Sequence, residues 1–272
     1  MRPNINEVLF YRPLIKHYDL VMSLSAREMA ARNANTYLGW LWGIVAPLIQ
    51  IAMYTFVFAY VFNVRWSGDM SGAAATSALK IFLGLTVFNL LADCVGQAPN
   101  LILGRVALVK KVVFPLEILP YVTVTTALRN FAINLLLFFV LYLTLIGQPA
   151  ISFLLLPIII LPLILISLGA MWFISSLSVF LRDMRNIVPI IMTILMFMSA
   201  IFYPSEMLSV KYPWLLRYNI LAWIIEQSRD VIFSDRRPDP IHLLIVTIVS
   251  ALIASVGYWW FIKTKKAFAD VI

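Results

Sequence analysis

LGWLWGIVAPLIQIAMYTFVFAYVF, residues 38–62, contains no Asp, Glu, Lys, Arg or His over 25 residues. A helix rises about 1.5 Å per residue, so about 20 apolar residues cross a hydrocarbon core of roughly 30 Å. This stretch is therefore predicted to span a bilayer. The 37 residues before it are basic and lack the apolar core of a signal peptide. We therefore expect the chain to begin on the cytoplasmic side.

The composition is that of an integral membrane protein. Hydrophobic residues make up 62% of the chain and charged residues 12%, with a mean hydropathy of +0.92. A soluble domain carries about twice that share of charge. The formal net charge is +8, but the basic residues lie at the ends of apolar segments, which argues for topology signals and against a nucleic-acid partner. The single cysteine, Cys94, excludes an internal disulfide, and the two isolated histidines favour no metal site.

Six apolar segments are predicted to be transmembrane helices. They are residues 38–62, 79–98, 119–146, 153–180, 187–203 and 241–262. The predicted fold is an all-α integral membrane protein with one transmembrane domain, residues 1–272. Its parts are a cytoplasmic interfacial helix (1–37), five spans (38–203), an outer re-entrant helical segment (204–240), a sixth span (241–262) and a cytoplasmic tail (263–272).

The basic residues predict the orientation of these spans. Thirteen of the 21 Lys and Arg residues lie in the four segments expected inside, residues 1–37, 99–115, 181–186 and 263–272. The long outer segment holds five basic residues, which five acids offset. We therefore expect both termini to be cytoplasmic.

Two segments beside the spans carry helical patterns. Residues 11–35 place apolar side chains at helical spacing among charges, which predicts an amphipathic helix lying in the cytoplasmic interface; a disordered basic leader is the alternative. The string PWLLRYNILAWIIEQSRDVIF, residues 213–233, predicts two short helices dipping into the outer leaflet, with a plain surface helix as the alternative.

Two charged turns are predicted on the cytoplasmic side. NLILGRVALVKKVVFPLEILP, residues 100–120, carries Arg105, Lys110 and Lys111 between helix-breaking prolines. LRDMRN, residues 181–186, carries Arg182, Asp183 and Arg185. These six residues are candidates for docking a separate protein. The basic ones also fit plain topology signals, but Asp183 works against a positive-inside count.

The chain lacks the motifs of an enzyme. It has no GxxxxGK[ST] phosphate loop, and no catalytic constellation of residues stands out. Only Asp93 and Arg129 lie plainly inside spans, and no internal repeat is obvious, so ion-coupled transport is not favoured. We expect no enzymatic activity from this chain alone and no cofactor in it. Its energy source is expected to be another protein.

In order along the chain, five pieces resemble the ABC-2 type permease of polysaccharide exporters. They are the basic leader, TYLGWLWGIVAPLIQIAMYTFVFAYVF (36–62), LVKKVVFPLEILP (108–120), FLRDMRNIVPIIMTILMFMSAIFYP (180–204) and WLLRYNILAWIIEQSRDVIF (214–233). That family includes the O-antigen, capsule and teichoic-acid export permeases. The W-x-W pattern after Leu-Gly is nearer to the O-antigen and teichoic-acid branch.

The resemblance implies a homodimer working with two copies of an ABC ATPase subunit that binds ATP and Mg. Such a complex moves an undecaprenyl-pyrophosphate-linked glycan, here O-antigen for lipopolysaccharide biosynthesis, across the bacterial inner membrane. The alternatives are an ABC-2 permease for a drug or small lipid, an ATP-independent secondary transporter or channel, and a membrane-embedded enzyme. An ATPase gene beside this one, flanked by glycosyltransferases, would favour glycan export.

Three further groups of candidate site residues follow. Tyr54, Phe58 and Phe62 share one helix face and, with Phe197, are predicted to line a glycan channel, although interfacial aromatics are also ordinary belt residues. The resemblance places a substrate entrance at Leu38 and Gly39, where Lys16, Arg27 and Arg32 are predicted to bind pyrophosphate or, alternatively, lipid headgroups. Asp93 and Arg129 are predicted to pair, within one chain or across the dimer; the alternative is that Arg129 reaches to the interface.

Overall fold

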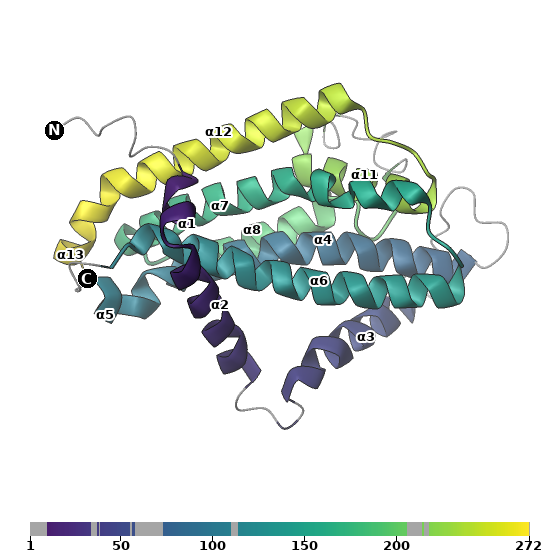
Figure 1. Cartoon of the computed structure of the whole chain (residues 1–272), viewed down its shortest axis with the longest axis horizontal. Helices are drawn as coiled ribbons and strands as arrows, with labels where there is room; N and C mark the ends of the chain where they lie inside the picture. The colour runs from purple at the N-terminus through teal and green to yellow at the C-terminus, as the bar shows by residue number, and fades with distance from the viewer. Residues whose placement is uncertain are drawn as a thin grey trace.

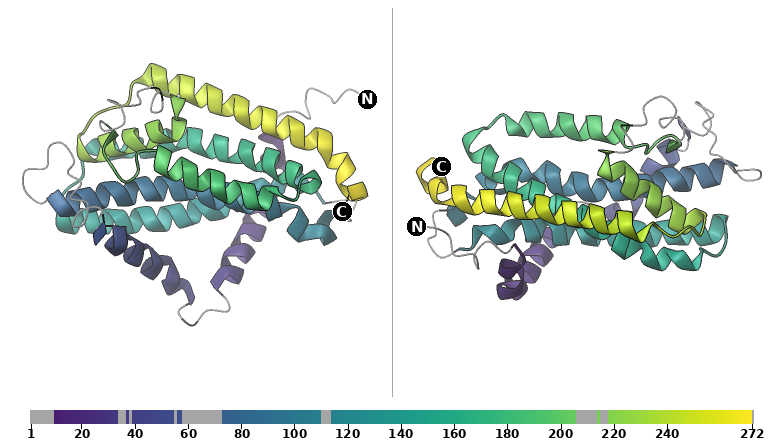
Figure 2. Two further views of the ribbon diagram at one scale, coloured as in Figure 1. Left: turned by 180° about the vertical axis from the view of Figure 1, so that it is seen from behind. Right: turned by 90° about the horizontal axis from the view of Figure 1, so that it is seen from above.

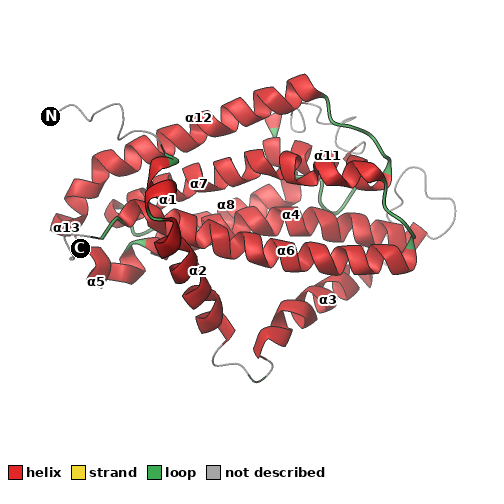
Figure 3. Cartoon of the chain, viewed as in Figure 1, coloured by secondary structure: helices red, strands yellow, loops and turns green. Residues whose placement is uncertain are grey.

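The structure, a computed structural model, describes residues 10–33, 37, 39–54, 56–57, 73–109, 114–205, 214 and 218–271. Every regular element within these residues is a helix (Figure 3), which confirms the all-α prediction. Leu38, Phe58, Phe62, Lys110 and Lys111 lie outside the described residues, as does the Arg32 side chain.

Four long apolar helices form the body of the molecule. They are α4 (Ala73–Leu101), α6 (Leu119–Leu145), α7 (Leu156–Phe180) and α12 (Pro240–Thr264). Each is long and apolar enough to cross a membrane, and each overlaps one predicted span. They run side by side along the long axis of the molecule (Figures 1 and 2), and α4 is the most buried of them. The chain is therefore a multi-pass membrane protein.

Two shorter apolar helices occupy the other predicted spans. These are α3 (Trp42–Tyr54), which contains Pro47, and α8 (Met184–Met198). At about 1.5 Å per residue, the described part of each is shorter than a hydrocarbon core of roughly 30 Å. The predicted continuation of the fifth span to Tyr203 is wrong in its boundary. Helix α8 ends at Met198, and Ala200 then adopts a positive φ of 51°, which a continuing α-helix does not allow.

Helices α7 and α12 cross at unusually close range. A Cβ built on Gly257 would lie 2.2 Å from the carbonyl oxygen of Gly169, and one on Gly169 would lie 2.7 Å from the carbonyl oxygen of Ile253. Near the ends of the same helices, the hydroxyls of Ser176 and Thr264 share a hydrogen bond of 2.6 Å. Small residues let helices approach closely in a membrane, where packing replaces the hydrophobic effect between helices.

The leader forms two helices, of which the second projects from the bundle. They are α1 (Arg12–Lys16) and α2 (Tyr18–Asn33), and α2 forms a V with α3 below α6 (Figure 1). Val21 and Ser25 are buried where α2 packs against α6, whereas Ile15 and Tyr18 are exposed. Fewer apolar side chains of the leader are therefore buried than the apolar pattern of residues 11–35 predicted.

The bundle has two chemically different ends. One, here called the basic end, holds α1, the short helix α5 (Val106–Val109), the turn between α7 and α8, and the terminal helices η7 (Lys265–Ala267) and α13 (Phe268–Val271). The opposite end holds α11 (Ile220–Phe233), which packs against α4 and α7 (Figure 1). Helix α1 and the end of the chain therefore lie toward the same end (Figure 1).

Candidate functional site

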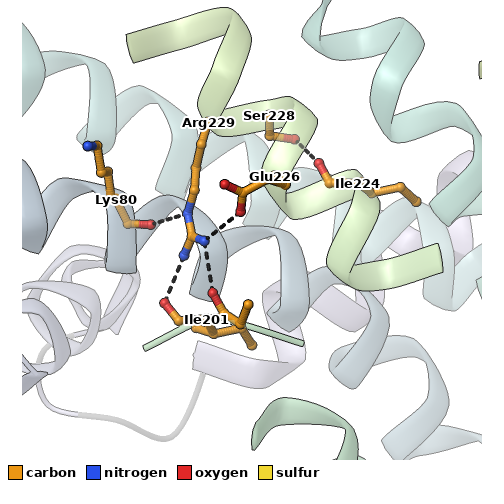
Figure 4. Close-up of polar contacts among 7 residues, drawn as sticks. Lys80, Ile201, Ile224, Glu226, Ser228 and Arg229 are labelled. Carbon is orange, nitrogen blue, oxygen red and sulfur yellow. Dashed lines mark hydrogen bonds and ion pairs between the residues drawn. The ribbon is translucent and has the colours of Figure 1, made fainter. Parts of the chain in front are cut away.

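Arg229 on α11 joins three elements at the opposite end of the bundle. Its side chain is only 3% exposed. The guanidinium donates through Nη1 to the Ala200 carbonyl and through Nη2 to the Ile201 carbonyl, both at 2.8 Å. Through Nε it donates to the carbonyl of Lys80 on α4 at 3.2 Å (Figure 4). We call Arg229 with these three carbonyls the arginine clamp.

The arginine clamp supplies hydrogen-bond donors to backbone carbonyls just after the end of α8. Where α8 ends, its carbonyls lose their intrahelical donors, and a buried unpaired carbonyl is costly, most of all where lipid replaces water. The planar guanidinium offers five donors in a fixed fork and so serves several carbonyls at once. Glu226, one turn earlier, supplies a carboxylate 3.3 Å from Nη1 and balances the buried charge. The clamp fixes α11 to α4 and to the end of α8.

The sequence predicted a helical segment around Arg229 but no role for this residue. A signal was present: a Glu226-x-x-Arg229 pair inside an otherwise apolar helical pattern. Asn219, which begins α11, accepts from the Ala222 amide at 3.2 Å and donates to the Met198 carbonyl at 3.2 Å. A second polar side chain therefore ties the start of α11 to the end of α8.

An aromatic cluster adjoins the clamp. The Phe202 ring lies 5.1 Å from that of Tyr54 and 5.7 Å from that of Phe197, centroid to centroid. Phe202 is 2% exposed, whereas Phe197 is 53% exposed. The structure thus brings together two of the predicted channel aromatics, Tyr54 and Phe197, through the ring of Phe202. Phe202 follows Ile201 directly, so the clamp positions the cluster.

At the basic end, the first charged turn is tied to the leader. Arg105, in η4 (Leu103–Arg105), forms an ion pair with Glu28 of α2. Partial burial lowers the pKa of the Arg105 guanidinium, which still leaves it charged at neutral pH. Arg105 was predicted to dock a partner or to act as a topology signal, and its pairing with Glu28 was not predicted, because the two residues are 77 positions apart.

The second charged turn presents its side chains to solvent. Arg182, Asp183 and Arg185 are all exposed between α7 and α8. Asp183 is the N-cap residue of α8, but its side chain makes no capping hydrogen bond. The carboxylate is therefore exposed and makes no capping hydrogen bond to the N-terminus of α8.

Of the predicted entrance residues, Lys16, Arg27 and Gly39 have described side chains or backbone, and Lys16 and Arg27 do not line the same pocket. Lys16 lines a pocket beside the end of α12, and Arg27 is exposed on α2 without lining that pocket. Gly39 adopts φ of +52°, in the left-handed region that favours glycine. Its position at the start of η2 (Gly39–Leu41) therefore depends on its lack of a side chain.

Asp93 takes a different partner from the predicted one. Its carboxylate accepts from Asn130 Nδ2 at 3.3 Å, and no ion pair with Arg129 occurs in the described part of the chain. Successive residues on a helix point about 100° apart, so only one of Asn130 and Arg129 faces the α4–α6 seam. The within-chain form of the predicted pair is therefore corrected, and the form across a dimer stays a prediction.

Comparison with known proteins places these features in a family. The model of the ABC-2 type transporter family matches residues 19–233. The chain is 26% identical to the O-antigen export system permease protein RfbA of Myxococcus xanthus, over 96% of this chain and 98% of that protein. Two Klebsiella pneumoniae proteins of the same name are each 24% identical over 94% of this chain and 95% of their own. With most of its length matched by the family model, the chain belongs to the ABC-2 type transporter family.

Proposed function

We propose that this chain is the permease subunit of an ATP-driven exporter that moves an undecaprenyl-pyrophosphate-linked O-antigen polysaccharide across the bacterial inner membrane. The observation that carries the proposal is similarity over 94–96% of the chain to proteins named O-antigen export permeases. A permease for a drug or small lipid would share the fold, but no similarity to one favours it.

The proposed topology has six spans, with α3 and α8 as parts of the first and fifth and with both termini cytoplasmic. It is supported by thirteen of 21 basic residues falling in the four segments expected inside. The leader would lie in the interface, and α11 would belong to an outer re-entrant segment.

The proposed partners are a second copy of this chain and two copies of an ABC ATPase. The chain has no phosphate loop of its own, so hydrolysis must occur elsewhere. The short turn between α7 and α8 exposes Arg182, Asp183 and Arg185. A partner bound there would contact two helices at once. The η4–α5 turn and residues 110–111 would form the second contact.

The proposed glycan path passes the aromatic cluster. Sugars stack their apolar CH faces on aromatic rings, and Phe197 offers an exposed ring held in place through Phe202. The arginine clamp would keep this wall fixed while other parts of the permease move.

Deletion of the gene tests the function. We expect surface O-antigen to disappear and lipid-linked polymer to accumulate inside, with recovery by the wild-type gene. A strain whose partner ATPase cannot hydrolyse ATP is the matched control and should show the same accumulation. Normal surface polymer in the deletion strain, together with intracellular retention of a drug or small lipid, would contradict glycan export.

A further inference from the structure

A pocket of about 920 Å³ lies at the basic end between α1 and the end of α12. Helix α1 and its flanks form one wall, and α12 with η7 forms the other. Its lining residues include Arg12, Ile15, Lys16, Glu117, Ile262 and Lys266. This pocket is separate from the arginine clamp and the aromatic cluster, which lie toward the opposite end.

The pocket is strongly cationic. Four of its lining residues are Lys or Arg, and Glu117 is its one acid. Glu117 is already neutralised, because Lys265 Nζ lies 2.6 Å from its carboxylate. Its backbone carbonyl accepts from Trp172 Nε1 at 3.2 Å, which holds the residue in place. Arg12, Lys16 and Lys266 have no ion-pair partner among the described residues, so the pocket offers three uncompensated positive charges.

The same pocket has an apolar wall. Ile15 is 72% exposed and Tyr11 is 47% exposed, and Ile262 lines the facing helix. Contacts of Phe10, which precedes Tyr11, hold this wall against the bundle. The Tyr121 hydroxyl donates a hydrogen bond to the Phe10 carbonyl, and the Phe10 ring lies 6.4 Å from that of Trp172. Cations beside exposed apolar side chains, at the end of a membrane helix, match an amphiphile with a phosphate headgroup.

We propose that this pocket binds the phosphate headgroup of an anionic lipid. Arg12, Lys16 and Lys266 would contact the phosphate, and Ile15 and Ile262 would contact the hydrocarbon chain of the lipid. Binding of a bilayer lipid does not depend on glycan export, whereas binding of a polyprenyl pyrophosphate rests on the proposed function. The lipid phosphate has two possible sources, an anionic glycerophospholipid of the bilayer and the pyrophosphate of a polyprenyl-linked cargo.

Lipid binding to the purified permease–ATPase complex tests the proposal by native mass spectrometry. The probes are phosphatidylglycerol and phosphatidylcholine, and the variant is R12Q with K266Q. We expect phosphatidylglycerol binding to weaken by roughly fivefold for each cation removed, and phosphatidylcholine binding to be weak throughout. The matched control, R236Q with R237Q, removes two exposed charges at the opposite end and should bind like wild type.

The charge-preserving variant R12K with K266R is the control for misfolding, and it should still bind phosphatidylglycerol. Competition with undecaprenyl pyrophosphate identifies the source: displacement of phosphatidylglycerol assigns the pocket to the cargo lipid, and no displacement assigns it to the bilayer. Equal binding of phosphatidylglycerol by the R12Q/K266Q variant and wild type would overturn the proposal. Displacement by inorganic phosphate as effective as by a lipid would overturn it too, because the apolar wall would then contribute nothing.

Discussion

Gly84 of α4 lies directly against Arg229 of α11. A Cβ built on Gly84 would lie 2.8 Å from Arg229 Nη2, and the Ile225 and Ile201 side chains close the remaining space. The missing side chain on α4 is what allows the guanidinium to reach the carbonyls of Ala200 and Ile201. The arginine clamp therefore requires both residues.

Gly84→Ala should displace the guanidinium and destabilise the permease by about 1–3 kcal/mol, the usual cost of overpacking. Alanine is a better helix former than glycine, so without the contact to Arg229 the same substitution would be expected to raise stability. Thermal unfolding of the purified permease measures the effect. Gly96→Ala on the same helix is the control, because a Cβ there meets nothing within 4 Å. An equal response from the two variants would contradict the clamp.

Gly257→Ala should disrupt the crossing of α7 and α12. The added Cβ would meet the Gly169 carbonyl oxygen at 2.2 Å, and backbone atoms cannot rotate away. We expect a loss of about 2–3 kcal/mol or a marked drop in folded yield on size-exclusion chromatography. Val256→Ala, next along the helix and 62% exposed, should leave the yield unchanged. A normal yield from Gly257→Ala would show that the crossing is looser than described.

The long spans could be predicted from sequence because length and hydropathy alone specify α4, α6, α7 and α12. The end of α8 could not, since the apolar run continues to Tyr203 and only the turn at Ala200, held by Arg229, stops the helix. The hydrogen bond of Asn130 to Asp93 and the ion pair of Arg105 with Glu28 depend on tertiary packing. A single sequence does not show which residues tertiary packing brings together. The pocket beside α1 likewise joins residues from the two ends of the chain.

The ion pair of Arg105 with Glu28 can be separated from docking by a charge swap. Arg105→Glu should loosen α2 by placing two acids together, at a cost on the order of 1 kcal/mol for a partly exposed pair. Adding Glu28→Arg should restore protection of α2 in hydrogen exchange. Because the swap still reverses the charge of the η4–α5 turn, ATPase co-purification should remain reduced. Unchanged exchange of α2 in the single variant would show that the pair does not hold the leader.

Tyr54→Ala should lower surface polymer roughly two- to tenfold. This is the change that corresponds to losing one aromatic contact of about 0.5–1.5 kcal/mol. Tyr54 packs on Phe202 with 5.1 Å between ring centroids, so its loss removes one wall of the aromatic cluster. Permease abundance and ATPase co-purification should stay normal. Tyr54→Phe keeps the ring and is the control. Wild-type export by Tyr54→Ala would exclude the cluster from the glycan path.

Asp183→Arg should uncouple transport from ATP hydrolysis or strip the ATPase from the purified permease. Asp183 is exposed between Arg182 and Arg185, and its carboxylate makes no capping bond, so the reversal removes no hydrogen bond from the N-terminus of α8. A partner that pairs with this carboxylate would instead face three cations, and burying one unpaired charge at an interface costs about 2–5 kcal/mol. ATPase co-purification and substrate-stimulated hydrolysis measure the effect, and Asp183→Glu, which keeps the charge, should behave like wild type. If Asp183→Arg co-purifies with a normally stimulated ATPase and exports polymer, the α7–α8 turn is not the docking surface.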